Sequence, residues 1–98
     1  MIGWTLQSTG DYEQMLRLPK GAVKTIGRTA RADFIVEAPL VSRIHCRLTA
    51  EPSDQLVVED LESTNGTLVN GRKVDRSVLR EGDKLTVGRV EFTVSRSG

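Results

Sequence analysis

Turn-forming residues recur along this chain about every eight to twelve residues, and this spacing constrains the fold more than any other feature. The segments between the turns are short and either apolar or alternating, and no window of about a dozen residues keeps a helical period. This pattern is typical of β-sandwiches and barrels. About ten short strands in a chain of 98 residues are expected to form two packed sheets. We therefore predict an all-β fold, a two-sheet β-sandwich.

The hairpin signals and the alternation locate individual strands. Asn70-Gly71 is the strongest hairpin signal, because a type I′ turn needs positive φ at both central residues. In the last strand Val90, Phe92 and Val94 alternate with polar residues and should face the core. We expect strands over residues 4–8, 12–18, 23–27, 34–36, 46–49, 56–60, 67–69, 72–74, 84–87 and 90–95.

Composition excludes several classes of protein. With 38% hydrophobic and 28% charged residues, we expect one folded domain over residues 1–98. A net charge of +1 and an aromatic content of 4% argue against a nucleic-acid partner. Neither a membrane-length apolar run nor a signal peptide is recognisable, and Cys46 has no partner for an intramolecular disulfide. We expect the domain to be a monomer that does not insert into a membrane. We expect it to be located in the cytoplasm, or in the nucleus if its source is a eukaryote.

Gly27-Arg28 is the first of three loop motifs that could bind an anion. The glycine lets the chain turn sharply where a strand ends, and the arginine supplies a rigid, permanently charged fork that suits phosphate or carboxylate. An ordinary surface arginine in a weak ion pair would look the same. The loops hold a local basic group: Arg28, Arg31, Arg43, Arg72 and Lys73.

Ser42-Arg43-Ile44-His45 is the second motif. Ser42 offers a hydroxyl donor and Arg43 a second positive charge. His45 could brace the loop as a neutral ring, or it could act as a general base on Ser42 in a hydrolase. The sequence has no nucleophile-elbow glycine pattern, which disfavours an enzyme. His45 is the only histidine and lacks cysteine partners at ligand spacing, so we expect no metal site and no cofactor.

Ser63-Thr64-Asn65-Gly66 is the third motif. Asn-Gly favours a turn with left-handed geometry, and the motif could be no more than that turn. Alternatively, Thr64 presents its hydroxyl to an anion while the Asn65 amide pairs with the backbone of an extended peptide, as donor and as acceptor.

The combination of these motifs resembles the forkhead-associated (FHA) domain family. The resemblance also covers the later segments Val69-Asn70-Gly71, Leu79-x-x-Gly82-Asp83 and Leu85-x-Val87-Gly88. It implies a sandwich of about eleven strands. In that family the loops at one end of the sandwich bind phosphothreonine in an extended peptide.

Carried over by position, the resemblance assigns a role to each motif residue. Phosphopeptide contacts fall to Arg28, Ser42, Arg43, Thr64 and Asn65. Support of the binding loops falls to Gly27, His45 and Gly66. Outside the motifs, Arg31 and Arg89 in the variable loops are candidates for reading the residues around the phosphothreonine. If Arg89 lies near the C-terminal side of the peptide, we expect a preference for an acidic residue there.

The resemblance thus implies a phosphothreonine-dependent binding module without catalysis. Its partner would be a protein phosphorylated by a serine/threonine kinase, and the module would recruit that partner in signalling. The alternative is a protein-interaction domain that uses the same sandwich but does not need phosphate. A module that only binds phosphothreonine usually acts through the protein to which it is attached. We therefore expect this domain to be part of a larger signalling protein.

Overall fold

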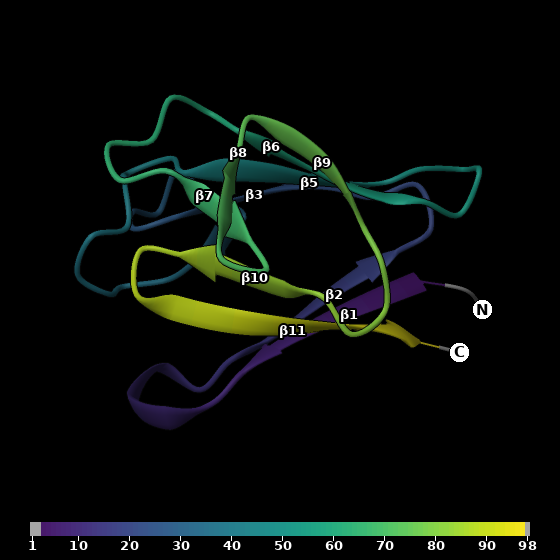
Figure 1. Cartoon of the computed structure of the whole chain (residues 1–98), viewed down its shortest axis with the longest axis horizontal. Helices are drawn as coiled ribbons and strands as arrows, with labels where there is room; N and C mark the ends of the chain where they lie inside the picture. The colour runs from purple at the N-terminus through teal and green to yellow at the C-terminus, as the bar shows by residue number, and fades with distance from the viewer. Residues whose placement is uncertain (1–2, 98) are drawn as a thin grey trace.

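The computed structural model describes residues 3–97 and folds them into two β-sheets packed face to face (Figure 1). This confirms the predicted all-β sandwich, now with eleven strands. The predicted domain range 1–98 also includes Met1, Ile2 and Gly98, which lie outside the described residues. Within residues 3–97, no helix is long and apolar enough to cross a membrane.

The larger sheet holds both ends of the described chain. Its strand order is β2-β1-β11-β10-β7-β8, and the β1–β11 pairing aligns Gly3 with Ser97. The hairpin between β7 and β8 turns at Asn70-Gly71, where both residues have positive φ, 52° and 82°, as predicted for a type I′ turn. The strands are β1 (Gly3–Ser8), β2 (Met15–Pro19), β7 (Thr67–Val69), β8 (Arg72–Val74), β10 (Lys84–Val87) and β11 (Val90–Ser97).

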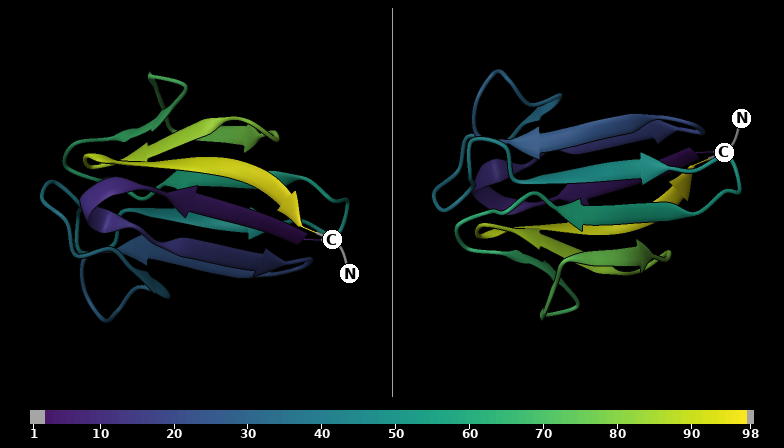
Figure 2. Two further views of the ribbon diagram at one scale, coloured as in Figure 1. Left: turned by 90° about the horizontal axis from the view of Figure 1, so that it is seen from below. Right: turned by 90° about the horizontal axis from the view of Figure 1, so that it is seen from above.

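The smaller sheet carries the strands that lead into the three loop motifs. Its order is β4-β3-β5-β6-β9, and only β3 and β4 run parallel. Figures 1 and 2 show that the loops after β3, β4 and β6 lie together at the end of the sandwich opposite the chain termini. The strands are β3 (Val23–Gly27), β4 (Phe34–Ile35), β5 (Cys46–Ala50), β6 (Leu56–Asp60) and β9 (Arg76–Leu79).

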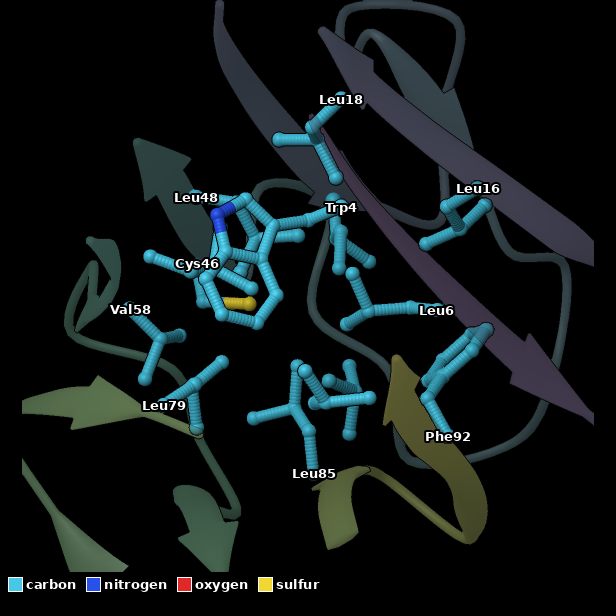
Figure 3. Packing of buried hydrophobic residues seen from close by; sticks show 14 of the residues in the cluster. Trp4, Leu6, Leu16, Leu18, Cys46, Leu48, Val58, Leu79, Leu85 and Phe92 are labelled. Atoms are coloured by element: carbon cyan, nitrogen blue, oxygen red, sulfur yellow. The ribbon is translucent and has the colours of Figure 1, made fainter. Parts of the chain in front are cut away.

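The core forms where the inward faces of the two sheets meet (Figure 3). Alternation decides the contributors, and Val90, Phe92 and Val94 are buried as predicted. Cys46 is fully buried, and this burial raises the pKa of its thiol to about 12, which disfavours the nucleophilic thiolate form. Residues drawn in the core include Trp4, Leu6, Leu16, Leu18, Leu48, Val58, Leu79 and Leu85.

Two segments differ from the expected strands. The strand expected over residues 12–18 begins only at Met15, because Tyr12 lies in the 3₁₀ turn η1 (Gly10–Tyr12). The buried Ser8 hydroxyl donates to the Tyr12 carbonyl at 2.6 Å, and this bond stabilises the turn that takes the place of the strand at Tyr12. Strand β9 was not predicted; it shows little alternation, and only Leu79 in it is fully buried.

Candidate functional site

The three loop motifs form one pocket of about 490 Å³, which we call the arginine pocket. Each motif contributes, although up to 37 positions separate the contributors along the sequence. The lining residues are Arg28, Leu40, Val41, Ser42, Arg43, Ile44, Glu62, Thr64 and Asn65. The structure therefore brings together every side chain that the resemblance assigns to phosphopeptide contacts.

Arg28 is held in place by backbone carbonyls. Its backbone N–H donates to the Ser42 carbonyl at 2.9 Å, and its Nε donates to the Val41 carbonyl at 3.0 Å. This leaves the two terminal guanidinium nitrogens free for a bidentate contact with an oxyanion. The ion pairs within residues 3–97 are Arg47–Glu59 and Arg96–Asp54, so no carboxylate of the described chain neutralises the pocket arginines.

Gly27 allows the second motif to approach the end of β3. A Cβ at this position would lie 2.1 Å from the carbonyl oxygen of Arg43 and 3.0 Å from Cα of Ile44. Both obstacles are backbone, so a side chain could not be accommodated by a rotamer change. The φ of Gly27 is not positive, so an unusual backbone conformation does not require glycine here; the close approach of the second motif does.

Ser42 connects the second motif to the third. The backbone N–H of Thr64 donates to Ser42 Oγ at 3.0 Å. Because the Ser42 oxygen accepts this bond, its own O–H remains available as a donor to an anion in the pocket. The Thr64 side chain is exposed at the same rim.

His45 is fully buried and braces both loops. Its Nδ1 accepts the backbone N–H of Ser42 at 3.1 Å, and its Nε2 lies 2.8 Å from the Gly66 carbonyl. Since Nδ1 accepts, the ring is the neutral tautomer with the hydrogen on Nε2, which donates to Gly66. With both nitrogens occupied by backbone groups, His45 has no lone pair for the Ser42 hydroxyl, contrary to the triad alternative.

Asp60 fixes the third loop, a role that the sequence analysis missed. Its Oδ1 accepts the hydroxyls of Ser63 and Thr67 at 2.5 and 2.8 Å, and Oδ2 accepts the Ser63 backbone N–H at 3.2 Å. Partial burial opposes ionisation, but these hydrogen bonds outweigh it and hold the pKa of Asp60 below its ordinary value. The Asp-x-x-Ser spacing was the available signal, because Asp side chains commonly cap local turns in this way.

Asn65 is tied to the second loop through the backbone. Its Nδ2 donates to the carbonyl of Leu40 at 3.1 Å, and Leu40 has a left-handed φ of 71°. One amide hydrogen is thus used internally, and the Oδ1 acceptor and the second hydrogen remain for a peptide. The carbonyls of Leu40 and Val41 were not anticipated, because a backbone acceptor leaves no mark in the sequence.

The remaining predicted residues lie around the pocket or outside it. Gly66 has φ +87°, and a Cβ there would lie 2.8 Å from Cε of Lys73. Arg89 lines a neighbouring pocket of similar volume, which it shares with Tyr12 and Pro39, and Arg31 lines neither pocket.

Comparison with known protein families identifies the family to which this chain belongs. The sequence model of the FHA domain matches residues 24–88, which include all three motifs. The chain is a member of the FHA domain family. The resemblance stated from the motifs is confirmed.

Relatives of this FHA domain extend the comparison. It is 40% identical over 75 residues to the ABC transporter ATP-binding/permease protein Rv1747 of Mycobacterium tuberculosis, covering 76% of this chain and 8% of the transporter protein. It is 37% identical over 68 residues to the glycogen accumulation regulator GarA of the same species, covering 69% of this chain and 41% of GarA. The chain therefore spans less than half the length of either relative.

Solved structures agree with the fold. A domain from work on phosphothreonine-dependent FHA interactions superimposes with a TM-score of 0.85 at 32% identity, covering 95% of each chain. The FHA domain of CT664 from Chlamydia trachomatis gives a TM-score of 0.90 at 23% identity, covering 98% of this chain and 99% of that one, and supports the fold alone.

Proposed function

We propose that this FHA domain binds proteins that carry phosphothreonine and recruits them in signalling, without catalysing a reaction. The observation that carries the proposal is the arginine pocket, where Arg28, Arg43 and the Ser42 hydroxyl face one recess with no carboxylate bound to either arginine. A site of this composition favours an oxyanion with several acceptor oxygens and more than one charge. Phosphorylated threonine has both properties.

Recognition would depend on phosphate through Arg28. Its terminal nitrogens would form charge-assisted bonds to two phosphate oxygens, and Ser42 would donate its hydroxyl to the phosphate. Arg43 would add positive charge, and Thr64 would contact the phosphate or the threonine methyl group. Unmodified threonine would gain none of the charge-assisted bonds, so it would bind much more weakly.

Asn65 would hold the backbone of the peptide. Its free Oδ1 would accept a peptide N–H, and its second amide hydrogen would donate to a peptide carbonyl. This pairing reads no side chain, so it would fix the register of the phosphorylated residue. Arg89, in the adjacent pocket, would contact a peptide long enough to extend past Pro39.

The relatives support recognition of phosphorylated protein rather than free phosphate. The solved neighbour with 32% identity comes from work on phosphothreonine-dependent FHA interactions, and another, at 33% identity, is the FhaA FHA domain in complex with the intracellular domain of Rv3910. By analogy, the partner of this domain would be a protein phosphorylated by a serine/threonine kinase.

Calorimetric titration with degenerate peptide pools tests the proposal. Pools carrying phosphothreonine, phosphoserine or unmodified threonine at the fixed position would be compared. We expect affinity near micromolar, about −8 kcal/mol, for the phosphothreonine pool only. Arg28→Ala should weaken binding by about 2–4 kcal/mol, by analogy with buried charge pairs at interfaces, because the phosphate would lose its guanidinium partner.

A matched variant separates the pocket from general charge. Arg72→Ala removes an exposed arginine on β8, outside the arginine pocket, and should leave binding unchanged. Equal binding of all three pools would instead favour the phosphate-independent interaction domain. Equal losses in Arg28→Ala and Arg72→Ala would indicate non-specific attraction of anions.

A further inference from the structure

We infer that Glu62 makes this FHA domain select phosphopeptides with a basic side chain close to the phosphorylated residue. The inference rests on the proposed function, and it names a feature of the partner that the phosphate contacts do not determine. Glu62 lines the arginine pocket together with Arg28, Arg43, Thr64 and Asn65. It is the only acidic residue in that lining.

Glu62 forms no ion pair within 4.0 Å in the described chain, although Arg28 and Arg43 line the same pocket. The ion pairs of residues 3–97 within 4.0 Å are Arg47–Glu59 and Arg96–Asp54. An exposed carboxylate in this lining weakens the attraction of Arg28 and Arg43 for a phosphate unless a further cation pairs with that carboxylate. A lysine or arginine of the peptide would supply that cation, so the ligand that complements the whole pocket is a phosphate next to a positive charge.

The backbone holds Glu62 at the rim. Its φ is 58°, a left-handed conformation that glycine or asparagine adopts more readily than glutamate. The residues on either side are anchored: the Leu61 N–H donates to the His45 carbonyl at 2.9 Å, and Ser63 is bonded to Asp60. These hydrogen bonds of both neighbours oppose a change of the Glu62 backbone to a more common conformation, and Glu62 lines the pocket from this loop.

The loop places Glu62 near the expected path of the peptide. Thr64 and Asn65 follow it within three positions and line the same pocket. Since Asn65 would pair with the peptide backbone next to the phosphothreonine, residues within about three positions of it lie within about 10 Å in an extended chain. A long basic side chain in that range can reach the Glu62 carboxylate.

A peptide scan with charge variants tests the inference. The probes are synthetic phosphothreonine peptides with alanine at the three positions on each side, and with arginine or glutamate introduced at one position at a time. Binding is measured by fluorescence anisotropy at low and at high salt. At one or more positions the arginine peptide should bind the natural domain about two- to fivefold more tightly than the alanine peptide, as expected for an exposed ion pair. The preference should shrink at high salt.

The variants assign that preference to Glu62. Glu62→Gln should abolish it, and Glu62→Lys should reverse it toward the glutamate peptide. Glu81→Gln, an exposed acid outside the arginine pocket, is the control and should keep the preference. A preference that persists in Glu62→Gln, or its absence from the natural domain, would overturn the inference while leaving phosphopeptide binding intact. If no phosphopeptide in the set binds the natural domain, the proposed function fails together with the inference.

Discussion

Replacing Gly27 with alanine should disrupt both the stability of the domain and its binding pocket. The added Cβ would lie 2.1 Å from the Arg43 carbonyl oxygen and 2.9 Å from the Arg43 carbonyl carbon. Contact with an oxygen normally begins beyond 3 Å, so the 42–45 segment would have to move away from β3 by roughly 1 Å. That segment carries Ser42, whose carbonyl accepts the Arg28 N–H.

The expected cost follows from the contacts that must stretch. Relieving an overlap in a packed region costs about 1–3 kcal/mol. The His45 N–H to Ile26 carbonyl bond at 2.8 Å and the Arg28 N–H to Ser42 carbonyl bond at 2.9 Å would be weakened, at about 1 kcal/mol each. The total of about 3–5 kcal/mol is a large part of the 5–15 kcal/mol that typically stabilises a domain.

Urea unfolding measures the change directly. Trp4 is the only tryptophan and is buried, so its fluorescence reports the transition. Gly82→Ala is the matched control: φ at Gly82 is +92° and a Cβ would meet nothing within 4 Å, so it should cost only about 1–2 kcal/mol of backbone strain. In phosphopeptide titrations of the folded proteins, Gly27→Ala should lose at least about tenfold in affinity, or 1.4 kcal/mol, while Gly82→Ala should keep its affinity. Stability of Gly27→Ala within about 0.5 kcal/mol of the natural domain would refute the packing argument.

Three further substitutions probe the site and the core. Arg28→Lys keeps the charge but loses the Nε bond and the fork, so phosphopeptide titration should show affinity reduced by about 1–3 kcal/mol, and unchanged affinity would contradict the oriented fork. Asp60→Asn should destabilise the domain by about 1–3 kcal/mol in urea unfolding, because one amide N–H would face the Ser63 N–H. The folded state lowers the pKa of Asp60. The ionised carboxylate therefore contributes fully to the free energy of unfolding above the unfolded pKa of about 3.9, and this contribution is lost as pH falls through the folded pKa. The difference between Asp60→Asn and the natural domain should therefore be constant from about pH 7 to 5 and shrink below about pH 4, and a difference that grows on acidification would contradict this sign. Phe92→Ala should cost about 3–5 kcal/mol by leaving a cavity between the sheets, and a smaller loss in thermal unfolding would mean that the core collapses around it.

Most of the fold could be predicted because two-residue alternation and turn residues are local signals. The β7–β8 hairpin follows from Asn70-Gly71 alone, and the core face of β11 follows from its alternation. Where a local signal was overridden or weak, the prediction was wrong. Tyr12 alternates correctly with its neighbours, but the buried Ser8 hydroxyl takes its carbonyl and ends the pattern.

The sequence could predict the side chains of the site but not the backbone groups that orient them. Motif spacing identified Arg28, Ser42 and Asn65, and the structure brings them to one pocket. The partners that orient two of these residues are the carbonyls of Val41 and Leu40. Every residue has a carbonyl, so sequence cannot show which ones turn toward the pocket; that depends on the left-handed φ of Leu40 and on the packing against Gly27.

Three polar side chains of the pocket each form one hydrogen bond within the domain and keep another group free for the ligand, so the residue type at each position matters. Arg28 donates from Nε to a carbonyl, and its terminal nitrogens remain free. Ser42 Oγ accepts a backbone N–H, and its own hydroxyl hydrogen remains free. Asn65 donates one amide hydrogen to a carbonyl, and its Oδ1 remains free. Fixing a free side chain on binding costs about 0.5–1.5 kcal/mol. Here folding has already met much of that cost, so more of the interaction energy is left for the ligand. Lysine, alanine or leucine at these positions would lose the internal bond along with the external one, and for that reason a substitution in this pocket should affect stability and binding together.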